Sequence, residues 1–142
     1  MVILTQTDTT VGFISQDEKK LSEIKERVST KPFIKVYKDF KTLLSHNHRV
    51  PNKFKNIVRR SKKTTFIINN IAFRVVKTSH KSQIIRDMPW HYSSSANERD
   101  QNFNREFCEQ KADIIVENID SFKESNSSSL YIINQNKRKK IR

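Results

Sequence analysis

Residues 64–76 read Thr-Thr-Phe-Ile-Ile-Asn-Asn-Ile-Ala-Phe-Arg-Val-Val, and this stretch carries the clearest local signal in the chain. Two runs rich in β-branched and aromatic residues, which are typical of strands, flank the pair Asn69-Asn70. Asparagine tolerates the positive φ angles that a two-residue turn requires. The sequence therefore predicts an antiparallel hairpin here.

Shorter strand and helix patterns alternate on both sides of the hairpin. Their spacing predicts strands at 2–6, 33–37, just before Ser93, 113–117 and 130–134, and helices at 16–28, after Asp39, from Pro51 on, at 80–87 and at 101–110. Ser15 followed by Glu18 matches a capping box at the start of the first helix. The whole pattern predicts a single α/β domain over residues 1–142, with a twisted, mixed parallel and antiparallel open sheet flanked by helices.

Composition excludes several classes of binding site. The chain of 142 residues has one glycine, Gly12, so it cannot build a glycine-rich phosphate loop. Its single cysteine, Cys108, forms no internal disulfide and is expected to be a buried packing residue, and the four histidines lack the spacing of a metal site. No apolar run is long enough to cross a membrane, and the start lacks a signal-peptide pattern. We expect a cytoplasmic protein without a structural metal.

The formal net charge of +13 predicts polyanionic partners. Five of the positive charges lie in the basic tail 137–142, and the rest of the chain still carries a surplus. This surplus is equally compatible with a solvated lysine-rich surface and with a nucleic-acid surface. The tail itself is either a frayed end or a segment that folds back over a ligand.

Four polar clusters follow predicted strands or close predicted helices. They are Thr7-Asp8-Thr9-Thr10, Lys25-Glu26-Arg27 with Lys31-Pro32, Ser93-Ser94-Ser95-Ala96-Asn97, and Ser127-Ser128-Ser129 with the basic tail. Loops at strand ends are where open α/β sheets bind ligands. Taken singly, each cluster also has a structural explanation as a capping turn, a solvated helix face or a loop. The pair Trp90-His91 could likewise stack on a base or lie at the rim of the core.

The order of these clusters resembles the Sua5/YciO/YrdC family of threonylcarbamoyl-adenylate synthases. Gln6-Thr7-Asp8-Thr9-Thr10-Val11-Gly12-Phe13 is similar to the family's Pro-Thr-Asp-Thr-Val-Tyr-Gly-Leu motif and holds the only glycine. The family's Lys-x-Arg-Pro and Lys-Pro-Leu motifs are similar to Lys25-Glu26-Arg27 and Lys31-Pro32-Phe33. Its threonine-bearing and arginine-bearing strands are matched by Thr65 and Arg74, and its Thr-Ser-Ala-Asn signature resembles Ser94-Ser95-Ala96-Asn97. Its closing elements resemble Ser128-Ser129-Leu130-Tyr131 and Ile141-Arg142. The five matches are collinear over nearly the whole chain.

The resemblance implies two groups of binding residues. Residues expected to bind ATP are Lys25, Arg27, Lys31, Ser95, Asn97 and Arg142, and residues expected to bind L-threonine are Thr7, Arg74, Ser93 and Ser128. Magnesium is expected with the triphosphate. No residue is nominated as a catalytic base. The chain departs from the family pattern at Gln6, Val11 and Val36, and it lacks the usual glycines after Asn97.

The resemblance implies a nucleotidyltransferase that makes threonylcarbamoyl-adenylate and pyrophosphate from L-threonine, bicarbonate and ATP. Its product would pass to a separate transferase that forms threonylcarbamoyladenosine in transfer RNA. The alternative is a non-catalytic protein with a YrdC-like fold that binds double-stranded, transfer or ribosomal RNA through the same basic concave face. Charge alone does not separate the two, because contacts to phosphates give RNA affinity without chemistry.

Overall fold

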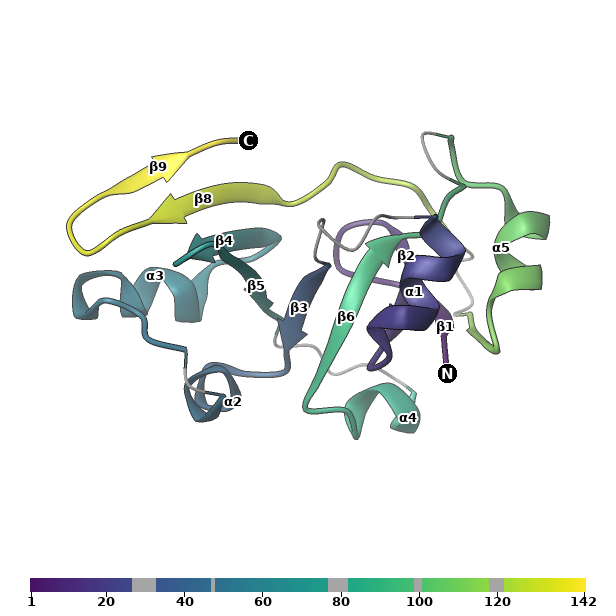
Figure 1. Cartoon of the computed structure of the whole chain (residues 1–142), viewed down its shortest axis with the longest axis horizontal. Coiled ribbons are helices and arrows are strands. Elements are labelled where there is room, and N and C mark those ends of the chain that lie inside the picture. Colours follow the sequence, from purple (N-terminus) through teal and green to yellow (C-terminus); the bar gives the residue numbers. More distant parts are fainter. Residues whose placement is uncertain (27–32, 47, 77–81, 99–100, 118–121) are drawn as a thin grey trace. The chain divides into compact units, whose positions relative to one another are not determined.

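The computed structural model describes residues 1–26, 33–46, 48–76, 82–98, 101–117 and 122–142 (Figure 1). The chain divides into two compact units, each made of two segments. Unit 1 comprises Met1–Phe33 and His91–Ser127, and unit 2 comprises Ile34–Trp90 and Ser128–Arg142. Arg27 and Lys31, both expected to bind ATP, lie outside the described residues.

Unit 1 is built on strands in the order β7-β1-β2-β6. Its elements are β1 (Ile3–Gln6), β2 (Val11–Ser15), α1 (Glu18–Lys25), β6 (Trp90–Ser95, of which Trp90 belongs to unit 2), α5 (Arg105–Lys111) and β7 (Ile114–Val116). β1 runs antiparallel to β2 and parallel to β7, and β2 runs antiparallel to β6. Leu4, Phe13, Leu21 and Cys108 are buried in one core, so α1 and α5 pack on the sheet through Leu21 and Cys108.

Unit 2 has strands in the order β3-β5-β4-β8-β9. Its elements are β3 (Ile34–Tyr37), α2 (Phe40–Ser45), the 3-10 turn η1 (Asn52–Phe54), α3 (Lys55–Arg60), β4 (Thr64–Ile68), β5 (Ile71–Val75), α4 (Gln83–Arg86), β8 (Ser129–Ile133) and β9 (Arg138–Lys140). The pairs β3–β5 and β4–β8 are parallel, whereas β4–β5 and β8–β9 are antiparallel. The predicted α/β class with a mixed sheet is confirmed. The assignment of residues 1–142 to one domain stays a prediction.

The hairpin predicted at 64–76 is confirmed as β4 and β5. Asn69 and Asn70 adopt φ angles of 52° and 63°, so both occupy the left-handed region that a two-residue turn of this kind requires. Phe66 lies opposite Phe73 in the register, and both rings are buried in the core of unit 2. The core of unit 2 also takes in Tyr37 from β3 and Val58 from α3.

The expected cap of the first helix was wrong, and the structure decides between the two alternatives for the basic tail. The cap of α1 is Asp17, whose carboxylate accepts hydrogen bonds from the backbone N–H groups of Lys19 and Lys20. Ser15 does not cap the helix, because it ends β2 and its hydroxyl donates to the carbonyl of Met1. The tail does not fray either, because Arg138–Lys140 forms β9 against β8.

Among the described residues, β2 and β9 are the two strands that the sequence patterns do not predict. All five residues of β2 are buried, so its apolar and polar residues do not alternate between a buried and an exposed face.

Among the described residues, no helix is long and apolar enough to cross a membrane.

Candidate functional site

Lys25 is the buried centre of a polar cluster in unit 1. It ends α1 one turn after Leu21, on the buried face of the helix, and only 6% of the residue is exposed. Its ammonium Nζ donates to the carbonyl oxygens of Ser95 and Asn97, at 2.9 Å each, and to Oδ1 of Asn97. An ammonium has three N–H bonds, so it can donate to these three acceptors at the same time.

The Ser95–Asn97 segment is fixed from both sides. The backbone N–H of Ala96 donates to the carbonyl of Val11 at 2.9 Å, and the methyl group of Ala96 is buried in the core. Asn97 Oδ1 accepts from the hydroxyl of Ser95 at 2.9 Å, and Asn97 Nδ2 donates to the carbonyl of Gln101 at 2.7 Å. The structure therefore brings together three of the residues expected to bind ATP, with Lys25 holding the other two in place.

Thr7 lies in the turn between β1 and β2. Its hydroxyl donates to the carbonyl of Thr10 at 2.6 Å and accepts from the backbone N–H of Thr9 at 3.3 Å. This is the capping-turn geometry that the cluster Thr7–Thr10 also predicts. In the structure, the hydroxyl proton of Thr7 is used in a hydrogen bond within the turn, to the carbonyl of Thr10.

Gly12 packs this turn closely against β6. A β-carbon at position 12 would lie 2.9 Å from the carbonyl oxygen of Ser94 and 3.1 Å from Cγ2 of Thr7. Gly12 pairs with Ser95 and the adjacent Ile14 pairs with Ser93, so the register places the Thr7 turn at the Ser95 end of β6. The only glycine of the chain is thus required by a close backbone approach.

Thr65 and Ser128 form a second polar cluster, in unit 2. Their hydroxyl oxygens lie 2.6 Å apart, Thr65 is fully buried, and Ser128 is 6% exposed. Arg142 Nε donates to the carbonyl of Ser128 at 2.9 Å, and Nη2 lies 3.4 Å from its hydroxyl oxygen. The backbone of Arg142 is held by Leu130, whose N–H donates to the Arg142 carbonyl. We call this the hydroxyl–arginine cluster.

Arg74 lies on the same face of the unit 2 sheet as this cluster. Phe66 pairs with Phe73 in the antiparallel register of β4 and β5, so the next residues along, Thr65 and Arg74, lie opposite each other on the other face. Arg74 is 5% exposed. Ser128 lies just before β8 and Arg142 just after β9. With Thr65 and Arg74 they provide two hydroxyls and two guanidinium groups, which can bind a carboxylate or a phosphate.

The structure divides the expected site residues between the two units. Unit 1 holds Lys25, Ser95, Asn97, Thr7 and Ser93, and unit 2 holds Arg74, Ser128 and Arg142. Thr65, which was matched to the family but not assigned to the site, is the residue that the expected set lacks. Its link to Ser128 depends on the parallel register of β4 and β8, which local sequence does not reveal.

Trp90 lies at the rim of the unit 2 core. The ammonium of Lys35 sits 4.1 Å from the centre of the Trp90 ring and 5.5 Å from that of Tyr37. Trp90 also packs against the core that contains Tyr37. Of the two roles considered for Trp90, the structure supports the rim position.

His48 lies beside this aromatic group, with its ring edge-on to that of Tyr37. Tyr37 Oη lies 2.8 Å from His48 Nε2 and donates to it in the tautomer protonated at Nδ1. Burial, with the charges of Lys35 and His46 beside it, lowers the pKa of His48 below its ordinary value. The unfolded chain therefore takes up a proton on His48 before the folded chain does, and the protein loses stability as the pH falls.

We expect the free energy of unfolding to fall as the pH drops from about 6.5 through the lower folded pKa of His48. His48→Gln keeps an acceptor for Tyr37 but does not titrate, so it should lack this part of the pH dependence. Urea unfolding of both proteins between about pH 7 and pH 5 checks it. If the free energy of unfolding changes with pH in the same way for both proteins over this range, the pKa of His48 is not lowered by folding.

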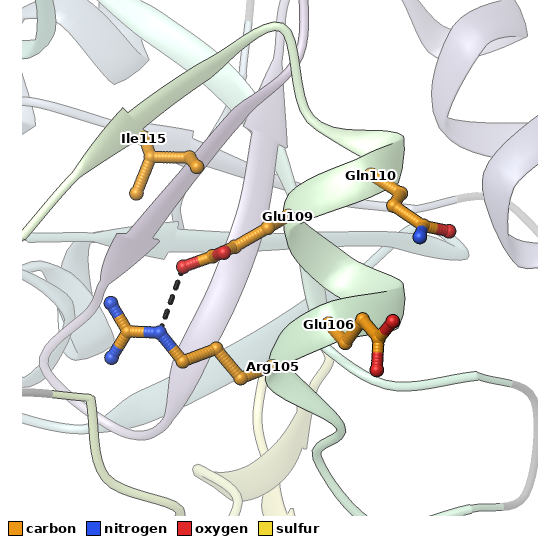
Figure 2. A pocket seen from close by; sticks show the side chains of 5 residues that line it. All are labelled: Arg105, Glu106, Glu109, Gln110 and Ile115. Atoms are coloured by element: carbon orange, nitrogen blue, oxygen red, sulfur yellow. Dashed lines mark hydrogen bonds and ion pairs between the residues drawn. The ribbon is translucent and has the colours of Figure 1, made fainter.

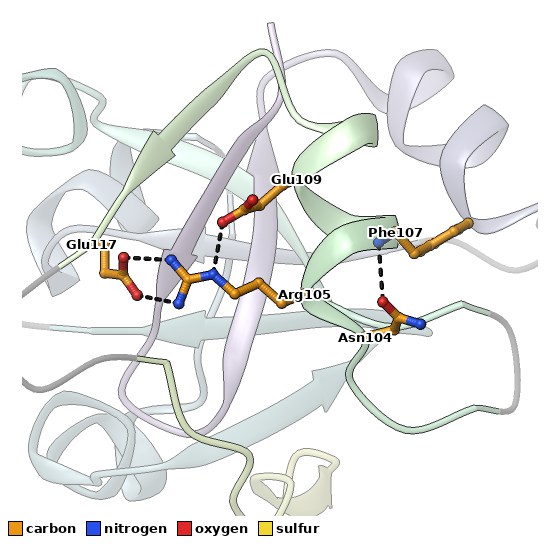
Figure 3. Close-up of polar contacts among 5 residues, drawn as sticks. All are labelled: Asn104, Arg105, Phe107, Glu109 and Glu117. Carbon is orange, nitrogen blue, oxygen red and sulfur yellow. Dashed lines mark hydrogen bonds and ion pairs between the residues drawn. The ribbon is translucent and has the colours of Figure 1, made fainter.

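Unit 1 has a hollow of about 580 Å³ that no residue of either polar cluster lines (Figure 2). It is lined by Arg105, Glu106, Glu109 and Gln110 of α5 and by Ile115 of β7. Arg105 donates to Glu109 at 2.8 Å and to both oxygens of Glu117 at 2.7 and 2.6 Å, as Figure 3 shows, and these bonds raise its pKa. The guanidinium of Arg105 is therefore paired with the carboxylates of Glu109 and Glu117. This pairing does not favour the binding of an anion in the hollow.

Comparison with protein-family models and with curated sequences gave no match. A variant of P. abyssi Sua5 matches in structure with a TM-score of 0.78 and 16% identity, over 99% of this chain. The chain has a Sua5/YrdC-like fold. P. abyssi Sua5 complexed with L-threonine matches with a TM-score of 0.76, and full-length HypF in a phosphate- and nucleotide-bound form matches with 0.74 and 14% identity.

The chain spans 49% of the length of P. abyssi Sua5 and 26% of the length of HypF. Each of these matches covers 99% of the chain itself. MTH1692 from Methanobacterium thermoautotrophicum is a smaller protein, of which the chain covers 79%, with a TM-score of 0.67 and 15% identity. The resemblance drawn from the sequence motifs is thus confirmed at the level of the Sua5/YrdC-like fold.

Proposed function

We propose that the protein is a threonylcarbamoyl-adenylate synthase that uses L-threonine, bicarbonate and ATP. The observation that carries the proposal is the Sua5/YrdC-like fold, shared with a Sua5 that was solved with L-threonine and a HypF that was solved with phosphate and nucleotide. Each of the two polar clusters has the chemistry that one of these ligands requires.

The hydroxyl–arginine cluster suits the amino acid. A threonine ligand brings a carboxylate, for which the guanidinium of Arg74 is a planar bidentate partner. Thr65 and Ser128 share one hydrogen bond between their hydroxyls, and one of their two protons suffices for it. The second proton can donate to a ligand oxygen, so Ser128, the more exposed of the two, is the better placed to meet the ligand.

The Lys25 cluster suits the nucleotide. The hydroxyl of Ser95 and the amide of Asn97 offer uncharged polar contacts, and Lys25 adds a buried positive charge directly beneath them. Because its ammonium donates to both Ser95 and Asn97, Lys25 acts by positioning these two residues and through its charge. Direct contacts to phosphate are proposed for Arg27 and Lys31, and Arg142 is proposed to help fix the nucleotide.

The reaction balances without a residue acting as a nucleophile. The threonine amine and bicarbonate give a carbamate and water. A carbamate oxygen then forms a bond to the α-phosphorus of ATP, and the bond from that phosphorus to the bridging oxygen breaks to release pyrophosphate. The protein has mainly to position the reactants and to stabilise negative charge, which cationic side chains and oriented N–H and O–H groups do.

Magnesium enters this scheme with ATP, as part of the substrate. Among the described residues there is no group of three or more His, Cys, Asp or Glu side chains that could hold a metal ion. The proposed product passes to a separate transferase acting on transfer RNA in the cytoplasm.

Release of pyrophosphate from ATP tests the proposal. With magnesium and bicarbonate present, we expect release that depends on L-threonine and that falls at least about 100-fold in Asn97→Ala, because that change removes a fixed polar contact to the nucleotide. Asn136→Ala, an exposed change of the same type, serves as the control. Absence of ATP turnover in the wild-type protein would contradict the synthase and leave the non-catalytic RNA-binding protein as the working hypothesis.

A further inference from the structure

The side chain of Gln6, the last residue of β1, is paired with the backbone of Lys123 in unit 1. Gln6 Nε2 donates to the carbonyl of Lys123 at 3.2 Å, and the N–H of Lys123 donates to Gln6 Oε1 at 2.8 Å. The two residues are 117 positions apart in the sequence. A carboxamide has one donor group and one acceptor group, so Gln6 pairs with Lys123 as the peptide group of a neighbouring strand would. We call the segment 122–125 the strap.

The strap is also held by the backbone of the β1–β2 hairpin. The N–H of Val11 donates to the carbonyl of Lys123 at 3.1 Å, and Val11 is the residue that pairs with Gln6 at the end of the hairpin. A carbonyl oxygen has two lone pairs, so it can accept from Gln6 and Val11 together. The N–H of Ser125 donates to Oγ1 of Thr10 at 3.2 Å. The strap therefore lies across the turn that carries Thr7 to Thr10.

Other contacts of the strap do not involve the hairpin. Glu124 Oε1 accepts a hydrogen bond from the N–H of Phe103. The rings of Phe103 and Phe122 meet edge to face, with their centres 6.1 Å apart, and both rings pack against the buried core of unit 1. Loss of the Gln6 hydrogen bonds should therefore free the strap from the hairpin without unfolding unit 1.

The pairing of Gln6 with Lys123 joins two segments that carry expected threonine-binding residues. Thr7 follows Gln6 directly, and Ser128 follows Lys123 by five residues. The residues expected to bind ATP on β6 and just after it are instead held by the ammonium of Lys25. A change at Gln6 should therefore affect L-threonine more than ATP.

We propose that Gln6 is a positioning residue for L-threonine, because its carboxamide fixes the strap against the turn that carries Thr7 and so fixes the chain that leads to Ser128. This inference rests on the proposed function, since it concerns a substrate of that reaction. The family motif has proline at the position of Gln6. A proline side chain has no hydrogen-bonding group and could not hold the strap in this way.

Steady-state pyrophosphate release by the full chain, with each substrate varied in turn, tests the inference. Gln6→Met keeps the length of the side chain but removes its donor and acceptor. KM for L-threonine should rise at least about tenfold, because a small misplacement of binding groups is costly, whereas KM for ATP and kcat should change by less than about twofold. Gln110→Met, an exposed change of the same type on α5, should behave as the wild type.

Substitutions of Lys123 test the same pair from its backbone side. Lys123→Pro removes the N–H that donates to Gln6 and should raise KM for L-threonine as Gln6→Met does. Lys123→Ala keeps this N–H and should leave KM unchanged, since the Lys123 side chain is exposed. The double variant Gln6→Met with Lys123→Pro should be within about twofold of the weaker single variant, because both changes remove the same interaction.

Hydrogen exchange of the Lys123 amide gives a readout that does not depend on catalysis. Exchange should be faster in Gln6→Met than in the wild type, and equal rates would overturn the inference because the carboxamide would then not hold the strap.

The kinetic outcomes separate this inference from the proposed function. A wild-type protein without threonine-dependent release would contradict the synthase, and the inference would fail with it. An active wild type whose KM for L-threonine is unchanged in Gln6→Met would overturn the inference alone. An equal rise in KM for both substrates would also overturn it, because it would show a general effect on unit 1.

Discussion

Replacing Lys25 with methionine should lower the free energy of unfolding by about 1–3 kcal/mol, because the change leaves the acceptors of a buried donor unsatisfied. Methionine fills a similar volume, so the loss reports the hydrogen bonds to Ser95 and Asn97 rather than packing. Urea unfolding measures the change. Pyrophosphate release should fall at least about tenfold in the same variant, because the Ser95–Asn97 segment loses its support.

Lys20→Met is the matched control for Lys25→Met. Lys20 lies in the same helix α1 and is exposed, so its replacement should change the free energy of unfolding by less than about 0.5 kcal/mol. Equal stabilities of the two variants would show that the Lys25 ammonium does not hold the loop.

Replacing Thr65 with valine should reduce kcat/KM for L-threonine at least about 100-fold, because it removes the partner that fixes the Ser128 hydroxyl, and a small misplacement of a positioning group is costly. The valine side chain has nearly the same shape, but it cannot form the 2.6 Å hydrogen bond to Ser128. KM for L-threonine should rise while KM for ATP stays the same. This expectation rests on the proposed function, and steady-state kinetics with each substrate varied measures it.

Thr64→Val separates a role in the site from a general effect on β4. Thr64 precedes Thr65 in the strand and also loses one hydrogen bond, from its hydroxyl to the carbonyl of Lys62 at 2.8 Å. Its side chain points to the opposite face of the sheet, so kcat/KM should be nearly unchanged. A similar loss in both variants would contradict the assignment of Thr65 to the threonine pocket.

The parts of the fold that the sequence predicts well are those whose cause is local. The β4–β5 hairpin follows from two strand-forming runs around Asn69-Asn70, and the positive φ angles of that pair confirm the reasoning. β2 and β9 have no such local cause. β2 is buried on both faces and contains Gly12, and β9 consists of Arg138–Lys140, which form a strand because β8 offers its edge.

For the candidate site, too, the sequence predicts only what has a local cause. Collinear motifs single out Ser95, Asn97 and Ser128, because each motif is short and continuous. The partners that define their roles come from elsewhere in the chain, since the acceptors of Lys25 are 70 and 72 residues away and Thr65 is 63 residues from Ser128. A lysine ending an amphipathic helix gives no local sign that its ammonium will be buried.

The most direct measurement is the mass of the adenylate formed by the full chain from ATP, magnesium, L-threonine and bicarbonate labelled with heavy carbon. The proposed synthase reaction predicts an adenylate that contains threonine and carries the label, formed in step with pyrophosphate. Formation of ADP or AMP alone, or of an adenylate without the label, would contradict the proposed function.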